Sequence, residues 1–437
     1  MANFAKPGGP QFSVDVYQNE YLPEGGREVN AIVTVTARGG TAPAGPGASA
    51  AVVLMVDCSG SMDYPSTKMR NARDATAAAV DTLRDGVHFG IVDGTHVARE
   101  VYPGGGRLAV ADPTTRAQAK QALRRLSAGG GTAIGTWLRL ADRLLAGVDV
   151  SIRHGILLTD GRNEHESAAE LKDTLDACAG RFTCDARGVG TDWEVKEVTG
   201  IASALLGTAD IVADPARLTE DFTRIMESTM GKEVADVALR VWTPVGTRIK
   251  FVKQVAPSVE ELTDRRTEAG PRAGDYPTGS WGEESRDYHL CVEVPAAGLG
   301  QEMLAARVSL VAARPDGPVQ NLGAQGLVRA VWTDDMAAST SLNAQVAHYT
   351  GQAELAQAIR EGMDLRKAGD MDGATAKLGR AVQLAGVSGN ADTAKLLAKV
   401  VDVVDAPTGT VRLKAKVAEA DEMTLETRST KTVRVKK

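Results

Sequence analysis

The sequence predicts an α/β fold: a Rossmann-like, doubly wound domain inserted in, or followed by, a β-sandwich, with a C-terminal helical region. Three observations support this prediction. Short apolar runs alternate with stretches of helical spacing over residues 50–231, which is typical of a mainly parallel sheet with helices on both faces. Over residues 232–335 apolar residues recur with a period of two, as in half-buried antiparallel strands. Residues 336–405 return to helical spacing.

Residues 1–49 contribute two expected strands, FSVDV and NAIVTVTA, separated by the turn residues LPEGGRE. A Gly/Pro/Ala linker, GGTAPAGPGAS, follows them. Two strands are not stable alone. We therefore expect them to pair with strands of the sandwich, which makes residues 50–231 an insertion.

The elements expected within residues 50–231 alternate between strand and helix. The first strand, AVVLMVD, is a continuous apolar run, as expected of a strand covered on both faces. The expected strands are AVVLMVD, HFGIVDG, VAREVY, RHGILLTD, FTCDARGVG and ADIVAD. The expected helices are KMRNARDATAAAVDTLR, TTRAQAKQALRRL, AIGTWLRLADRLL, SAAELKDTLDACA, VKEVTGIASALLG and ARLTEDFTRIMESTM.

The remaining chain is assigned to three parts. The sandwich strands expected in 232–335 are VADVALRVWTP, TRIKFVKQV, YHLCVEVP, LAARVSLVAA and GLVRAVWTD. Residues 336–405 are expected to form a helical bundle that includes two helices joined by a turn at GDMDG. Residues 406–437 are expected to form a strand-like tail whose basic end, TKTVRVKK, is a solvated edge strand.

The bulk composition excludes some classes of protein. The chain has 437 residues, enough for two or three domains, and its net charge of −6 argues against a nucleic-acid partner. No apolar stretch reaches the roughly 18 residues of a membrane span. The N-terminus has no apolar signal segment, and the four cysteines form no CxxC pair, so we expect reduced thiols and a cytoplasmic location.

Oxygen-bearing side chains follow the expected strands at three places. Asp57 ends the first strand and is followed by Ser59 and Ser61, Thr132 ends the run GGGT, and Asp160 ends the fourth strand. In a sheet of order 3-2-1-4-5-6 the first and fourth strands are neighbours, and ligands bind beyond their carboxyl ends. The topology therefore predicts that these side chains converge at one place.

Hydroxyl and carboxylate oxygens favour Mg²⁺, with Ca²⁺ or Mn²⁺ as alternatives, over Zn²⁺. Ser59, Ser61 and Thr132 are expected to supply neutral ligands, while Asp57 and Asp160 orient waters. Such a cation lacks neutralising charge. We therefore expect it to attract an Asp or Glu side chain of a partner protein.

The segments DCSGS, GGGTAIG and LLTDG resemble, in order, the metal-ion-dependent adhesion site of the von Willebrand factor A family, written DxSxS, a distant Thr and a distant Asp. The resemblance covers residues 50–231. It implies a non-enzymatic, Mg²⁺-dependent interaction module or scaffold that binds a partner carboxylate. It also points to bacterial cytoplasmic members that work beside AAA+ ATPases or in phosphosignalling and tellurium-resistance-like systems.

Several alternatives stay open at this level. Asp57, Ser59 and Ser61 are also good helix N-cap residues. The same site would serve a metal-dependent hydrolase or phosphatase, or a structural subunit whose cation only stabilises the fold. Asp63 and Asp93 are interpreted as solvated turn residues, and Glu164 and His165 as exposed loop residues without a catalytic role. The sequence does not specify the partner or the oligomeric state.

Overall fold

The computed structural model describes residues 10–39, 49–314 and 317–435. The chain divides into two compact units, residues 43–235 and residues 1–42 together with 236–437. The first unit is therefore an insertion in the second. Of the two predicted arrangements, an α/β domain inserted in the sandwich or followed by it, the structure has the first. Most of the predicted Gly/Pro/Ala linker (residues 40–48) and the first nine residues of the chain lie outside the described residues.

The inserted unit is an α/β domain. Its strands are β4 (Ala50–Asp57), β5 (His88–Gly94), β6 (Arg99–Tyr102), β7 (Ala109–Val110), β8 (Ile152–Thr159), β9 (Thr183–Val189) and β10 (Ala209–Val212). Its helices are α1 (Thr67–Thr82), α2 (Pro113–Leu123), α3 (Ile134–Ala146), α4 (Ala168–Cys178), α5 (Val195–Ala204) and α6 (Leu218–Met230), with the 3₁₀ turns η1 (Gly60–Asp63) and η2 (Pro215–Arg217). The predicted alternation of strand and helix is confirmed.

The sheet of this unit has the order β10-β9-β8-β4-β5-β6, with β7 paired to β5. This is the predicted 3-2-1-4-5-6 order, with β4 beside β8. Strands β10, β9, β8, β4 and β5 run parallel, whereas β6 and β7 are antiparallel to β5. The carboxyl ends of the parallel strands consequently share one edge of the sheet.

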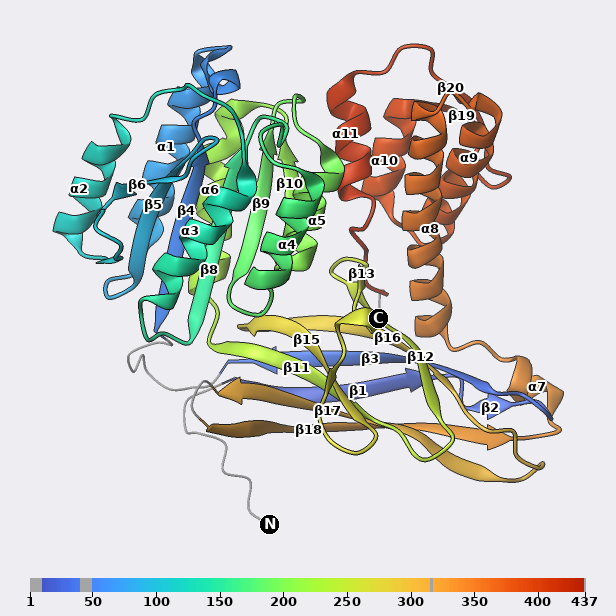
Figure 1. The fold of residues 1–437 in the computed structure, drawn as a ribbon. Helices are drawn as coiled ribbons and strands as arrows, with labels where there is room; N and C mark the ends of the chain where they lie inside the picture. Colours follow the sequence, from blue (N-terminus) through green and yellow to red (C-terminus); the bar gives the residue numbers. More distant parts are fainter. Residues whose placement is uncertain (1–9, 40–48, 315–316, 436–437) are drawn as a thin grey trace. The chain divides into compact units, whose positions relative to one another are not determined.

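Both faces of the sheet are covered, which explains the continuous apolar run of β4. Ala50, Val52, Leu54 and Val56 pack into a core with side chains from α1, α2 and α6. The alternate residues of the strand are equally buried on the other face, which α3, α4 and α5 cover in Figure 1. A strand with no solvent face cannot show the alternation of a half-buried strand.

The second unit contains a β-sandwich. Its strands are β1 (Gln11–Gln18), β2 (Tyr21–Leu22), β3 (Glu28–Arg38), β11 (Val234–Trp242), β12 (Arg248–Ala256), β13 (Glu260–Glu261), β14 (Thr267–Glu268), β15 (Ala273–Trp281), β16 (Glu284–Glu293), β17 (Glu302–Arg314) and β18 (Gly317–Trp332), with the 3₁₀ turn η3 (Thr263–Arg265). One sheet has the order β1-β3-β16-β12-β13, and the other β14-β15-β11-β17-β18-β2. The N-terminal strands complete the sandwich, as predicted, because β3 pairs along β16.

Strand β15 was not predicted. Its sequence, AGDYPTGSW, carries two glycines and a proline, which are residues typical of turns. Tertiary packing overrides these local preferences, because Tyr276 and Trp281 of this strand are almost fully buried in the sandwich core. Thr278 also donates its hydroxyl to the carbonyl of Val237 on β11 at 2.7 Å.

The helical part comprises α7 (Met336–Thr340), α8 (Ala344–Lys367), α9 (Met371–Val387), α10 (Ala391–Val400) and α11 (Glu419–Arg428), with the hairpin strands β19 (Val401–Asp405) and β20 (Thr410–Leu413). Helices α8 and α9 are the predicted pair around GDMDG. The helical region ends at Val400 rather than at 405, because the β-branched run that follows pairs as β19 with β20. The predicted strand-like start of the tail is β20.

The rest of the predicted tail differs from the structure. Helix α11 occupies its middle, and the end is not a solvated edge strand. Instead the Thr432 amide donates to the Pro257 carbonyl at 3.0 Å, and Arg434 lies 3.3 Å from the Asp287 carboxylate. Asp287 is buried and also accepts the Tyr349 hydroxyl at 2.5 Å. A buried carboxylate needs partners, which explains why the exposed Arg434 directs its guanidinium to Asp287.

The helices of the described part of the chain were compared with the length and hydropathy of a membrane span. None of the helices there combines the length and the apolar character that crossing a membrane requires.

Burial of a histidine makes the stability of the sandwich unit depend on pH. His289 on β16 is 5% exposed, and its Nε2 lies 2.9 Å from Asn30 Oδ1. Burial, together with the nearby charge of Lys253, lowers the pKa of His289 from 6.5 to about 4. The folded state therefore holds this imidazole neutral where the unfolded chain would bind a proton.

We expect the free energy of unfolding to fall as the pH drops below about 6.5, because only the unfolded chain then gains a proton at His289. By pH ~4 the loss from this group amounts to about 3 kcal/mol. Urea denaturation of the full chain at several pH values measures it. His289→Gln should flatten the pH dependence, whereas His96→Gln, at an exposed position, should not. A His289→Gln protein with the wild-type slope would contradict the prediction.

Candidate functional site

The candidate site begins where two neighbouring strands end. Val56 of β4 is in register with Leu158 of the parallel strand β8. Asp57 is the last residue of β4, and Asp160 follows the last residue of β8. Both side chains are 0% exposed. The pairing of two strands thus places two carboxylates, 103 residues apart, at one edge of the sheet.

Asp57 connects the loops that leave these two strands. Its Oδ1 accepts the Ser59 amide at 2.7 Å, and its Oδ2 accepts the Thr159 hydroxyl at 2.7 Å and the Asp160 amide at 3.3 Å. Burial raises the pKa of Asp57 to about 6, the charge of Asp160 adds to this rise, and the hydrogen bonds from Ser59 and Thr159 oppose it. Both oxygens already accept bonds from the protein, which suits an orienting role.

Three hydroxyl oxygens surround one small space. Ser59 Oγ lies 2.9 Å from Ser61 Oγ, which donates to Asp160 Oδ1 at 2.6 Å. A Cβ atom added to Gly161 would lie 3.2 Å from Ser61 Oγ, 3.4 Å from Thr132 Oγ1 and 3.8 Å from Ser59 Oγ. Because residue 161 is a glycine, a small space stays open here. The hydroxyl groups of two other loops face this space. Ser59, Ser61 and Thr132 thus face this space, Asp160 is bonded to Ser61, and Asp57 is bonded to the Ser59 amide beside it.

Backbone hydrogen bonds hold the two hydroxyl-bearing loops together. The Gly60 amide donates to the Gly130 carbonyl at 2.9 Å, and the Gly129 amide donates to the Cys58 carbonyl at 2.8 Å. Gly130 has φ = +81°, a conformation that disfavours any residue with a Cβ. The turn itself therefore requires glycine at position 130.

Two residues that the sequence analysis did not select fix the position of Thr132. Asn163 Oδ1 accepts the Ile134 amide at 2.8 Å, and Glu166 Oε2 accepts the Gly135 amide at 2.8 Å. These amides begin α3 and have no partner within the helix. Because Asn163 and Glu166 satisfy them, the start of α3, two residues after Thr132, is held against the loop that follows Asp160. Their position shortly after LLTDG is the only signal in the sequence.

Glu164 and His165 are exposed, in agreement with their interpretation as loop residues. His165 has a local structural role, because its Nδ1 accepts the Thr132 amide at 3.3 Å. Gly131 makes room for this ring, since a Cβ there would lie 2.1 Å from His165 Cε1.

The prediction that Asp63 and Asp93 are solvated turn residues is correct for Asp63 and wrong for Asp93. Asp63 is exposed. Asp93 instead lies within β5 and is half-buried, and its Oδ1 is buried without a hydrogen-bond partner among the described residues. Burial raises the pKa of Asp93, against the lowering effects of Cys58 and Arg99. The observed β5 coincides with the expected strand HFGIVDG, and Asp93 is therefore a strand residue and not part of a turn.

Lys68 is the other residue that the sequence analysis missed. It is the second residue of α1 and only 5% exposed. Its ammonium lies 2.7 Å from Asp160 Oδ2 and 3.3 Å from Asp192 Oδ2. Burial alone would lower the pKa of Lys68, but its hydrogen bonds and charge pairing with Asp160 and Asp192 raise it above 10.5. A lysine at the start of a helix is normally solvated, so nothing in the sequence distinguishes this one.

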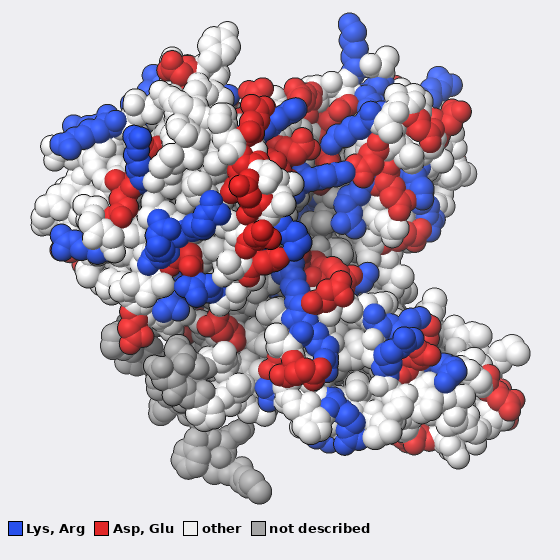
Figure 2. Space-filling model, viewed as in Figure 1, with Lys and Arg blue, Asp and Glu red and all other residues white. Residues whose placement is uncertain are grey.

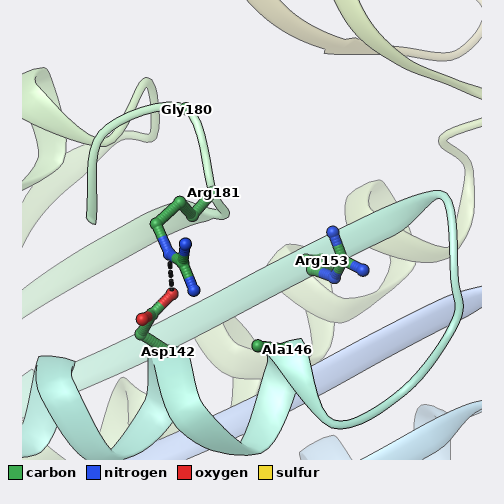
Figure 3. A pocket seen from close by; sticks show the side chains of 5 residues that line it. All are labelled: Asp142, Ala146, Arg153, Gly180 and Arg181. Carbon is green, nitrogen blue, oxygen red and sulfur yellow. Dashed lines mark hydrogen bonds and ion pairs between the residues drawn. The ribbon is translucent and has the colours of Figure 1, made fainter. Parts of the chain in front are cut away.

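A hollow of about 300 Å³ lies at the opposite end of the sheet, near the start of β8 (Figure 3). Its charged groups already have partners within the chain. Arg181 Nε donates to Asp142 Oδ1 at 2.5 Å, and Arg153 Nε donates to the Leu145 carbonyl at 3.1 Å. Both arginines therefore bind groups at the C-terminal end of α3. Their positions are explained by these contacts, and no bound ligand is needed to explain them.

The donor set at the sheet edge suits a hard cation. The residues facing the space offer hydroxyl and carboxylate oxygens, which are ligands that Mg²⁺, Ca²⁺ and Mn²⁺ prefer. Within the described ranges, no group of three or more His, Cys, Asp or Glu side chains is arranged to hold a metal ion. A cation here would therefore depend on the serine and threonine hydroxyls.

The order of the sheet and the hydroxyl-bearing loops at its carboxyl edge define a class of protein: open α/β domains, in which ligands bind at that edge. Comparison with known proteins agrees. Residues 50–211 match the von Willebrand factor type A domain, and residues 383–429 match the von Willebrand factor type A C-terminal domain. No curated protein matches the chain.

Two solved structures extend the comparison. A von Willebrand factor type A protein from Catenulispora acidiphila is 52% identical, with 99% of each chain covered and a TM-score of 0.94. The ArnB paralog VWA2 from Sulfolobus acidocaldarius is 13% identical, with 97% of this chain and 100% of that chain covered and a TM-score of 0.59, and it shows the fold alone. This chain therefore belongs to the von Willebrand factor type A family. Such domains are generally protein-interaction modules, and those with a metal-ion-dependent adhesion site bind divalent metals.

Filling the space beside Gly161 should impair cation binding without unfolding the protein. We expect Gly161→Ala to weaken Mn²⁺ binding at least about tenfold, because its methyl group would sit among the three hydroxyls and displace a ligand. Gly129→Ala is the matched control on the neighbouring loop, since a Cβ there would meet nothing within 4 Å. Isothermal titration with Mn²⁺ measures both. Equal affinities of the two variants would contradict the assignment of this space.

Proposed function

We propose that this chain is a non-enzymatic, divalent-cation-dependent protein-binding module. In this proposal Ser59, Ser61 and Thr132 hold a Mg²⁺ ion directly, and Asp57 and Asp160 act through water or through the serines. An Asp or Glu side chain of a partner protein completes the coordination. The convergence of the three hydroxyls around Gly161, beside two buried carboxylates, is the observation that carries the proposal.

The charge of the site favours a ligand that brings its own carboxylate. The direct donors are neutral hydroxyls, and the Lys68 ammonium already offsets the charge of Asp160. A divalent ion held there would keep most of its positive charge, and would bind an external anion more strongly than water. The ion supplies this attraction, while the chain supplies a rigid edge that presents it.

The chain's own residues maintain that edge. Asp57 holds both strand ends through Ser59 and Thr159. Asn163 and Glu166 hold α3, and through it the Thr132 loop. These contacts are made by buried groups, so the hydroxyls keep their positions before a partner arrives, which lowers the entropic cost of binding.

The surface of the α/β unit carries side chains of both signs on the face drawn in Figure 2. Specific recognition would then depend on the cation and on the loops around it. Mg²⁺ as the resident ion, a cytoplasmic location and action beside an AAA+ ATPase or in a phosphosignalling or tellurium-resistance-like system remain predictions.

The proposal predicts a partner whose retention depends on Mg²⁺ and on Ser61. We expect an immobilised full-length chain to capture a protein from extract of its own cells with Mg²⁺, and to lose it in EDTA or with Ser61→Ala. Ser66→Ala, which removes an exposed hydroxyl without a capping hydrogen bond, should retain it. Quantitative mass spectrometry compares the four samples. Capture that is equal in EDTA and Mg²⁺ would favour a cation that only stabilises the fold.

A second measurement separates binding from catalysis and from folding. Mg²⁺ at a hundredfold excess over its dissociation constant should raise the free energy of unfolding by about 2.7 kcal/mol.

The proposal also predicts no phosphatase activity, so hydrolysis of p-nitrophenyl phosphate by the chain should not exceed the blank. Turnover that disappears in Asp57→Ala would instead support the metal-dependent hydrolase or phosphatase.

A further inference from the structure

Lys68 occupies an unfavourable place for a cation. It lies in the first turn of α1, where the helix dipole is positive, and its side chain is almost fully withdrawn from water. Both effects destabilise an ammonium group, and among the described residues Asp160 and Asp192 compensate for them. Asp192 is 70% exposed, so its charge is screened by solvent and the buried Asp160 is the stronger partner.

The contacts of Asp160 show what the ammonium does. One carboxylate oxygen accepts the Ser61 hydroxyl at 2.6 Å, and the other accepts the Lys68 ammonium at 2.7 Å. Asp160 therefore faces the hydroxyl-lined space through one oxygen and Lys68 through the other. A positive charge attached to that carboxylate reduces the negative potential available to a second cation in the same space.

We propose that Lys68 is a built-in counter-cation that limits the affinity of the site for a divalent ion and thereby makes stable occupancy depend on the partner's carboxylate. This inference rests on the proposed function and deepens it. Lys68 acts through Asp160 and is a positioning residue. Without metal, its ammonium keeps two neighbouring buried carboxylates from being left uncompensated. With metal, its repulsion keeps the ion weakly held until an external anion arrives.

The consequence is a site that is ordered whether or not it holds an ion, and whose ion and partner bind cooperatively. A lysine that served only to stabilise the fold would not produce this behaviour, since its removal would weaken the fold and the site together. Removal of a counter-cation instead strengthens cation binding while it weakens the metal-free protein. The two roles therefore predict opposite changes in metal affinity.

The test uses the full-length chain and Mn²⁺ alone as the probe, with affinity measured by isothermal titration. We expect Lys68→Met, which retains the length of the side chain and loses the charge, to bind Mn²⁺ at least about tenfold more tightly than the wild type. Lys68→Arg should restore an affinity close to that of the wild type. Arg70→Met removes an exposed positive charge two residues along the same helix, and should change the affinity less than about twofold, because solvent screens it.

Each outcome decides the question. An Mn²⁺ affinity of Lys68→Met that equals or falls below that of the wild type overturns the inference. If Lys68→Met is unfolded without metal, folding on addition of Mn²⁺ supports it, and a protein that stays unfolded in millimolar Mn²⁺ overturns it. Failure of the proposed function has a different signature, in which the folded wild type and the folded variant both bind no Mn²⁺.

Discussion

The parallel pairing of β4 with β8 is the interaction on which the site depends. It brings Asp57 and Asp160 to one edge of the sheet, and the hydrogen bonds of Asp57 then tie the two strand ends into one loop system. The strands are covered on both faces, so their ends cannot shift without disturbing the core. Burial of the sheet is thus what gives the hydroxyl groups a fixed position.

The predictable part of the molecule is the part that local pattern determines. Continuous apolar runs and helical spacing identified the α/β unit, and the topology rule for such sheets placed β4 beside β8. The motif around Ser59 could be recognised because turn residues follow a buried strand, and the motif around Thr132 because a run of glycines precedes a helix. Strand β15 and helix α11 were missed for the opposite reason: their burial depends on distant elements, and their own residues favour turns or offer few apolar side chains.

The groups that support the site could not be found in this way. Asn163 and Glu166 are ordinary polar loop residues, and Lys68 is an ordinary residue for the start of an exposed helix. Their roles arise only when the loop after β8 meets α3 and when α1 meets Asp160. The sequence pattern predicts which side chains lie at the end of a strand. It does not predict which charged side chains from other elements pack against them, because these contacts form only in the folded chain.

The insertion has a consequence for the order in which the chain folds during synthesis. All strands of the α/β unit lie within one continuous segment, so this unit has everything it needs once that segment has left the ribosome. The sandwich does not, because its N-terminal strand β3 pairs with β16, as in the contact between Thr36 and Ser285, which are 249 residues apart. The hairpin of β1 and β3 must therefore wait for β16 while the inserted domain is made, and a chaperone that shields strand edges would act on its open edge in that interval.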